Sequence, residues 1–255
     1  MERRYLTDPY CGEIETTAEH TLTRDGELWL APSVLIFHPE GGGQPNDRAE
    51  LLVQGKNVPI EGVGRQDGRV YLRVRPDEDD LSELSWLYGS GEPFTYKIDL
   101  DYRLKAMRRH TAAHVLMACL RRNLSDYVPK GMTIPEDLGA VQLRFLGKED
   151  VETLAEKVNG DANALIASGC EVKPESYASI ELAKAARPDL FRADEGLPFR
   201  KAVRMLFIDG VDFNPCGGTH VKDISEIGSV KIGKCGRIEE SLQTIEFFVP
   251  DLAAV

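Results

Sequence analysis

Two short segments of the sequence carry side chains that can share one metal ion. His110 and His114 lie in the segment HTAAH, and Cys216 and His220 lie in the segment CGGTH. Histidines four residues apart on a helix project from one face, where both imidazoles can approach the same ion. The two glycines of CGGTH allow a tight bend that presents a thiolate and an imidazole together. Three nitrogen ligands and one sulfur ligand suit tetrahedral zinc, so the sequence predicts one zinc ion.

Each segment also has an ordinary structural explanation. A histidine on an apolar helix stripe is more often a hydrogen-bonded core residue, and a cysteine in a turn is more often a small buried apolar group. Four protein ligands would complete the zinc shell, as in structural sites, whereas a catalytic ion usually keeps one position for water or substrate. A zinc peptidase is excluded because HTAAH lacks the glutamate of HExxH. The structural and catalytic alternatives both remain open at this point.

The first part of the chain has the pattern of a β-rich domain. From about residue 13 to 98, short apolar or alternating runs are separated by turn residues, which predicts antiparallel strands that could close into a small barrel. The predicted strands are ELWL, VLIFH, AELLV, VPIEGV, RVYLRV and PFTYKID.

The hydrophobic period then changes to that of a helix. Apolar positions recur at steps of three and four residues from Leu104 to Ala118, with Asp99 or Asp101 available as the N-cap. Further helices are predicted at about 149–167 and 177–186, and strands flank CGGTH. We therefore expect an α+β fold, with a β-barrel-like domain at 1–98 followed by an α+β zinc-binding domain at 99–255.

Composition narrows the class of protein. No apolar run approaches the roughly 18 residues that span a bilayer, and MERRYLTDPY is not followed by the apolar stretch of a secretory signal. Five scattered cysteines without CxxC spacing fit a reducing compartment, so we expect a cytoplasmic protein without membrane contact. The net charge of −11 means that binding to a nucleic acid requires a local basic patch. Candidates for that patch are Arg103, Lys105, Arg108, Arg109, Arg121, Arg122, Lys231, Lys234 and Arg237.

Several motifs together resemble the AlaX family of free-standing alanyl-tRNA editing proteins, which are similar to the editing domain of alanyl-tRNA synthetase. The resemblance is carried by LKAMRRHTAAHVL, VNGDANALI, CGGTHVKDISEIGSVKI, the run at 236–239, and EGGGQP in the first domain. It implies a translation-factor-type barrel before a zinc-bearing editing domain, with zinc at His110, His114, Cys216 and His220. The implied reaction is zinc-dependent hydrolysis of the ester in tRNA(Ala) mischarged with serine or glycine.

The residues that would contact the substrate are less sharply indicated. The resemblance makes Gly42, Gly43 and Gln44 candidates, because successive glycines expose backbone amides to a phosphate or to the tRNA end. Thr111 and Gln142 are candidate pocket groups, with ordinary packing as the competing explanation. Synthetase editing domains usually carry Gln-Lys-Gly-Ser where this chain has PKGM at 129–132, which puts the amino-acid discrimination in doubt.

Three competing functions are compatible with parts of the sequence pattern. The first is a structural-zinc tRNA-binding module without catalysis, and the second is an editing hydrolase for another tRNA, such as Ser-tRNA(Thr). The third, a complete aminoacyl-tRNA synthetase, is not expected because 255 residues leave no room for a charging domain beside the two predicted domains. No catalytic side chain is assigned from the sequence.

Overall fold

The structure is a computed structural model of the chain. It describes residues 1–53, 55–75, 84, 87, 91, 93–124, 127–145, 151–191, 202–238 and 242–252. The chain forms two compact units, Met1–Gly41 with Pro45–Leu104 and Gly42–Gln44 with Lys105–Val255. The short segment Gly42–Gln44 therefore belongs to the second unit, although the sequence on both sides of it belongs to the first.

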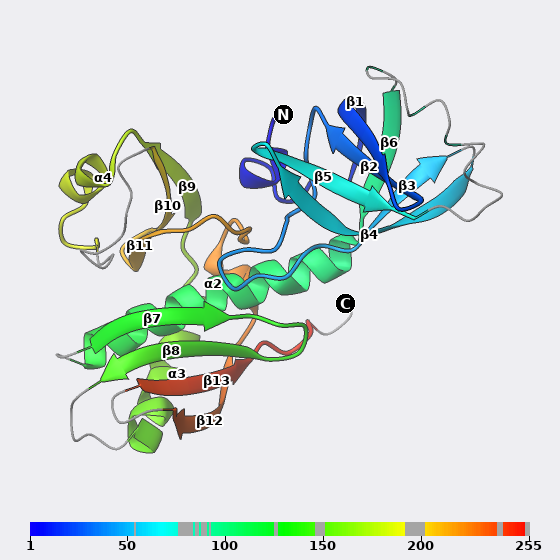
Figure 1. Ribbon diagram of the computed structural model, residues 1–255. Helices are drawn as coiled ribbons and strands as arrows, with labels where there is room; N and C mark the ends of the chain where they lie inside the picture. The colour runs from blue at the N-terminus through cyan, green and yellow to red at the C-terminus, as the bar shows by residue number, and fades with distance from the viewer. Residues whose placement is uncertain are drawn as a thin grey trace. The chain divides into compact units, whose positions relative to one another are not determined.

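The first unit is a closed antiparallel β-barrel, as the alternating runs predicted. Its strands follow the order β1-β2-β5-β4-β3-β6, and each strand pairs antiparallel with its neighbour (Figure 1). Buried leucine, isoleucine, valine and aromatic side chains fill its interior. The strands are β1 (Glu13–Arg24), β2 (Glu27–Pro32), β3 (Ala49–Val53), β4 (Lys56–Gln66), β5 (Arg69–Val74) and β6 (Pro93–Ile98).

One predicted strand, VLIFH at 34–38, is wrong. Leu35, Ile36 and Phe37 are consecutive and all fully buried, so the segment lacks the in-and-out alternation of a barrel strand. Its backbone bonds go elsewhere, because the Leu35 N–H donates to the Glu2 carbonyl at 2.8 Å and the Ile36 N–H donates to the Tyr96 hydroxyl at 2.7 Å. An apolar run of this length can fill a core as irregular chain when tertiary contacts satisfy its amides.

A buried ion pair lies within the first unit. The guanidinium of Arg103 is fully buried and donates from Nε to the Asp47 carboxylate at 2.8 Å. It also donates to the carbonyls of Pro9 at 2.9 Å and Ile36 at 2.7 Å. The second Asp47 oxygen accepts from Arg103 and from the His38 N–H. Arg103 is therefore a structural residue and not part of a surface that could bind phosphates, as the basic run had suggested.

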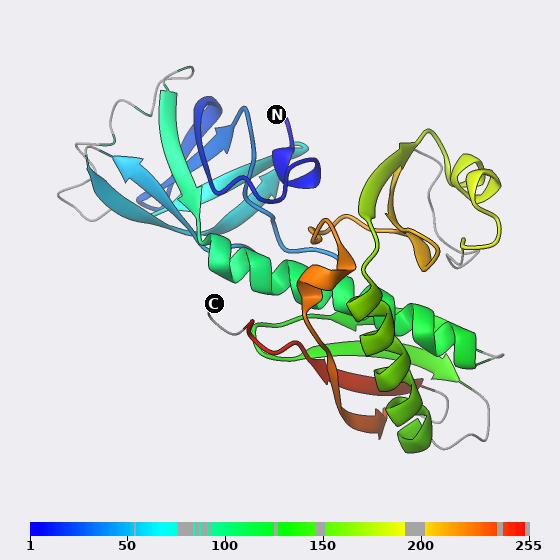
Figure 2. The same ribbon diagram turned by 180° about the vertical axis from the view of Figure 1, so that it is seen from behind.

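The second unit is built around a long helix and a four-stranded antiparallel sheet. Helix α2 (Leu100–Asn123) begins after Asp99, whose carboxylate accepts the Tyr102 N–H at 3.0 Å, so Asp99 is the cap. The sheet has the order β12-β13-β8-β7, and α2 and α3 lie on the same face of it (Figures 1 and 2). These elements are α3 (Val151–Ser168), β7 (Tyr127–Thr133), β8 (Gly139–Phe145), β12 (Lys231–Arg237) and β13 (Leu242–Phe248).

A smaller sheet precedes the CGGTH segment. Its order is β11-β10-β9, and the predicted α+β class is confirmed. The helix expected from Tyr177 starts later, because Tyr177 ends β9 and Ser179 caps α4 by accepting the Leu182 N–H at 3.4 Å. The remaining elements are β9 (Val172–Tyr177), α4 (Ile180–Ala186), β10 (Val203–Ile208), β11 (Asp212–Pro215) and the short 3-10 helices η1 (Arg4–Leu6) and η3 (Ile224–Ile227).

Some predicted features lie outside the described residues. These are the acidic stretch at 76–80, the predicted start of the second helix at 149, positions 200–201 and Glu239. Among the described residues, no helix has the length and apolar character needed to cross a membrane.

Candidate metal centre

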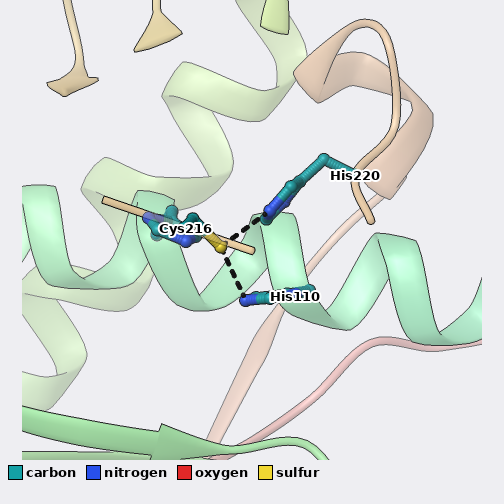
Figure 3. A group of neighbouring side chains, drawn as sticks. His110, Cys216 and His220 are labelled. Carbon is teal, nitrogen blue, oxygen red and sulfur yellow. Dashed lines mark hydrogen bonds between the residues drawn. The ribbon is translucent and has the colours of Figure 1, made fainter. Parts of the chain in front are cut away.

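The four predicted ligands converge in the second unit. His110 and His114 come from α2, while Cys216 and His220 come from the turn after β11, and their ligand atoms all lie within 4.8 Å of one another. The Cys216 Sγ atom lies 3.5 Å from His110 Nε2 and 3.2 Å from His220 Nε2 (Figure 3). Tetrahedral zinc, with bonds near 2.0 Å to nitrogen and 2.3 Å to sulfur, would separate such atoms by about 3.6 Å. The group could therefore hold a metal ion.

Gln44 fixes the orientation of His110. Its Oε1 atom accepts the Thr219 N–H at 2.9 Å and lies 3.0 Å from His110 Nδ1, so His110 must donate from Nδ1. Gln44 Nε2 in turn donates to Thr219 Oγ1 at 2.8 Å. The Nε2 lone pair of His110 is thus left for the metal side. Gln44, expected to contact substrate, is only 1% exposed and instead joins the ligand helix to the CGGTH turn.

Thr111 has the same role for His220. Its hydroxyl donates to the Met107 carbonyl at 2.9 Å and can therefore accept from His220 Nδ1, 3.3 Å away. It also accepts the Val221 N–H at 3.3 Å. Thr111 is fully buried, so the structure places this candidate pocket residue behind a ligand.

His114 is oriented by a carboxylate. Its Nδ1 lies 2.9 Å from Oδ2 of Asp212, which is fully buried. Its Nε2 is also buried and has no hydrogen-bond partner in the described part of the chain. A buried ring nitrogen without a partner is costly unless a ligand satisfies it, and this one belongs to the four-residue group. No motif in the sequence singles out Asp212, which lies four residues before Cys216.

The pKa shifts of Cys216 and His220 favour the protonation states that bind metal ions. Burial opposes the Cys216 thiolate, but His110 and His220 outweigh burial and hold its pKa well below the usual range. Burial, with a smaller effect of His110, lowers the pKa of His220 to about 3, which leaves a neutral imidazole. For His114, burial opposes the cation, yet Asp212 and Cys216 raise its pKa to about 9. A metal ion at Nε2 would replace that proton.

The CGGTH backbone is shaped by its neighbours. A side chain at Gly218 would overlap the His110 imidazole and the Gln44 amide, so only glycine fits there. At Gly217, which is exposed, a Cβ would meet no heavy atom within 4 Å. Arg204 of β10 donates to the carbonyls of Cys216 at 2.7 Å and Gly218 at 3.1 Å. The site is thus closed at Gly218 and open beside Gly217, next to the half-buried Cys216.

The other predicted contact residues divide between two places. Gly43 packs against the Met132 backbone and accepts the Ile134 N–H at 2.9 Å, which leaves no room for a side chain. Gly42 is exposed, with a φ of 62° and open space around it. Gln142 is half-buried and alternates along β8 with the buried Val141 and Leu143, so its side chain lies on the opposite face of the sheet from theirs.

Most arginines of the basic run on α2 are turned into the protein and do not form a phosphate-binding surface. Arg108 is buried, and its guanidinium donates to the carbonyls of Ile227 and Pro250, each at 2.7 Å. Arg109 is also buried, and Arg121 pairs with Asp212. The spacing of these residues had suggested that they bind tRNA, but these three side chains are largely buried. Lys105 and Arg122 of the same run are exposed. Lys231 and Lys234 of β12 remain exposed.

Comparisons with known proteins show what the chain resembles. A family described as the threonyl and alanyl tRNA synthetase second additional domain matches residues 203–246, which include Cys216 and His220. The alanyl-tRNA editing protein AlaX-L of Pyrococcus horikoshii is 27% identical over 249 residues, covering 97% of this chain and 57% of that protein.

Alanine–tRNA ligases match over a similar range. The ligase of Halobacterium salinarum is 28% identical over 252 residues, covering 96% of this chain and 26% of the ligase. That of Thermoplasma acidophilum is 31% identical over 245 residues, covering 95% of this chain and 26% of the ligase. The chain thus spans a little over half of AlaX-L and about a quarter of these ligases. The resemblance to alanyl-tRNA editing proteins is confirmed along almost the whole chain.

Proposed function

We propose that this chain, which resembles the AlaX family of alanyl-tRNA editing proteins along almost its whole length, is a trans-editing hydrolase. Its substrate would be tRNA(Ala) mischarged with serine, and also with glycine. Water adds to the carbonyl of the ester between the amino acid and the terminal ribose, the ester C–O bond breaks, and the free amino acid and the ribose hydroxyl are released. The support for this reaction is the similarity to AlaX-L and to alanine–tRNA ligases.

The cofactor we propose is one zinc ion held by His110, His114, Cys216 and His220. The observation that carries it is the convergence of three Nε2 atoms and one thiol, with each histidine held at Nδ1 by a different residue. Such anchoring of the second ring nitrogen is general for histidines that bind metal ions. When bound, zinc would supply a Lewis acid that polarises a carbonyl or lowers the pKa of a water.

The protein side chains would define how the ester approaches. His110, His114 and His220 are at most 5% exposed, so water is excluded from the helix side of the site. Gly217 offers the open side, and we propose that the aminoacyl end of the tRNA enters there. Gly42 remains a proposed substrate contact, because its backbone is exposed and unobstructed. For Gln44 and Thr111 we propose a supporting role, since their burial favours building the site over touching the substrate. We propose the same role for Gly43, because a side chain there would overlap the Met132 backbone.

Two alternatives are supported by specific observations. Four protein ligands would complete a tetrahedral shell, which favours a structural-zinc module that binds tRNA without hydrolysis. The matched family is named for both threonyl and alanyl synthetases, which keeps an editing hydrolase for Ser-tRNA(Thr) as a second alternative.

A deacylation assay separates these functions. The zinc-loaded protein is incubated with Ser-tRNA(Ala), Gly-tRNA(Ala), Ala-tRNA(Ala) and Ser-tRNA(Thr), and release of the amino acid is followed over time. We expect serine and glycine to be released from tRNA(Ala) faster than alanine. Binding of tRNA without release of any amino acid would support the structural module, and release only from Ser-tRNA(Thr) would support the second alternative.

A further inference from the structure

Asp212 connects the two segments that supply the ligands. It is the first residue of β11, four residues before Cys216 along the chain. On α2, His114 and Arg121 are seven residues apart and therefore lie on one face of the helix, two turns apart. The Asp212 side chain is fully buried and contacts both.

The contacts of Asp212 use both carboxylate oxygens. Oδ2 accepts from His114 Nδ1 at 2.9 Å, while Oδ1 accepts from Arg121 and from the Asn214 side-chain amide, the latter at 2.6 Å. Arg121 is mostly buried, so its charge compensates the carboxylate at short range. The result is a chain of contacts from Arg121 through Asp212 to the imidazole of His114.

We propose that Asp212 is a positioning residue of the metal site, held in place by Arg121, and that it sets the tautomer, orientation and donor strength of His114. This inference rests on the proposed zinc site. His110 and His220 are held by the neutral Gln44 and Thr111, so His114 alone has an ionised acceptor at Nδ1. A carboxylate there makes an imidazole a stronger donor to metal than an amide or a hydroxyl does.

The geometry distinguishes this role from a simple fold-stabilising pair. Arg121 and Asn214 both donate to Oδ1, whereas Oδ2 accepts from His114 Nδ1. A proton held on Nδ1 leaves Nε2 as the His114 atom that faces the other ligands. Asp212 also lies on the same short segment as Cys216. Its contacts with His114 and Arg121 of α2 therefore help to hold the Cys216 thiolate in position. One carboxylate thereby aligns a ligand from each half of the site.

The test compares Asp212→Asn with Asp209→Asn in the full chain. Asparagine keeps the shape of the side chain but removes the charge, and Asp209 is an exposed aspartate three residues away. Zinc affinity is measured by competition with a chromophoric chelator, and the absorption spectrum is recorded with Co²⁺ in place of zinc. We expect Asp212→Asn to bind zinc about 10- to 100-fold more weakly, with an altered Co²⁺ spectrum. Asp209→Asn should match the wild type in both.

A stability measurement separates positioning from folding. Denaturant unfolding is recorded with zinc and with excess chelator for each variant, and Asn214→Ala serves as a milder variant that removes one Oδ1 contact if Asp212→Asn does not fold. A positioning role predicts a larger stability loss with zinc than with chelator. Equal losses under both conditions, with wild-type zinc affinity, would overturn the inference. A wild-type protein that binds zinc but deacylates nothing would instead contradict the proposed hydrolase and leave this test intact.

Discussion

Two buried polar clusters, one in each unit, differ in how completely the protein satisfies them. In the barrel unit, the Arg103 guanidinium is matched by the Asp47 carboxylate and two carbonyls. In the second unit, the Nδ1 atoms of three histidines are equally well matched, but their Nε2 atoms face one another and a thiol. Both clusters join segments far apart in the sequence. The difference is that the second cluster brings four possible metal-ligand atoms together, and these atoms could bind one ion.

This contrast gives a physical criterion for telling structural from functional burial. Burying polar groups is costly, so a native protein pairs them. A cluster that closes on itself stabilises the fold and needs nothing more. A cluster that leaves a buried polar atom without a partner, as at His114 Nε2, retains that cost unless an ion is bound. The following predictions test whether the two clusters do behave in these two ways.

The largest effect is expected from removing the thiolate. Cys216→Ala deletes the one sulfur ligand, and we expect zinc in the purified protein to fall from about one ion per chain to a small fraction, with loss of deacylation. Metal analysis and the serine-release assay give the two readouts. Cys170→Ala, which alters a free cysteine outside the group, should keep its zinc. An undiminished zinc content in Cys216→Ala would defeat the ligand assignment.

The closed cluster should respond in stability and not in metal binding. Arg103→Met leaves the Asp47 carboxylate buried without its cation, which typically costs about 3–5 kcal/mol of unfolding free energy. Denaturant unfolding measures this loss, and zinc affinity of the folded protein should stay at the wild-type value. Lys97→Met, which breaks the exposed pair with Glu50, should change stability little. If Arg103→Met left stability unchanged and weakened zinc binding, the contrast between the clusters would fail.

Gln44 should support zinc binding although it lies far from the ligands in the sequence. Gln44→Ala removes the acceptor of His110 Nδ1 and the bonds to Thr219, so we expect about 10- to 100-fold weaker zinc binding. Chelator competition provides the measurement, and Gln66→Ala on the barrel surface is the matched control. If Gln44→Ala bound zinc with wild-type affinity but bound tRNA more weakly, Gln44 would be a substrate contact and not a support of the metal site.

The two glycines of CGGTH should differ from each other. Gly218→Ala would push a methyl group into the His110 ring, and overpacking of this kind costs at least about 1 kcal/mol of unfolding free energy. Because the ring that must move carries a proposed zinc ligand, we expect zinc affinity to fall as well. Gly217→Ala meets open space and should leave zinc affinity unchanged while slowing deacylation, if substrate enters on that side. Equal zinc affinities of the two variants would contradict the assigned shape of the turn.

The sequence predicts the ligands better than it predicts their surroundings. Residue type and spacing in the two segments together make His110, His114, Cys216 and His220 the candidate ligands, because each pair lies within one local element. The acceptors at Nδ1 are Gln44, Thr111 and Asp212, and each comes from a different segment than the histidine it holds, so the spacing that marks the ligands does not mark their acceptors. Gln44 was selected for a different task, since the letters GGGQP do not reveal that its amide is buried.

Charge and hydrophobicity patterns mislead for a related reason. Arg103 and Arg108 look like solvated cations in the sequence, yet both guanidinium groups satisfy buried oxygens. The segment 34–38 looks like a strand, yet its amides bond to Glu2 and Tyr96. In each case the partner lies tens of residues away or more, and local propensity contains no information about it.

The most direct test of the account is zinc X-ray absorption spectroscopy on the purified, zinc-loaded protein. We predict one ion per chain with three nitrogen ligands at about 2.0–2.1 Å and one sulfur ligand at about 2.3 Å. A spectrum without a sulfur ligand, or a protein that retains no zinc when supplied with it, would contradict the account.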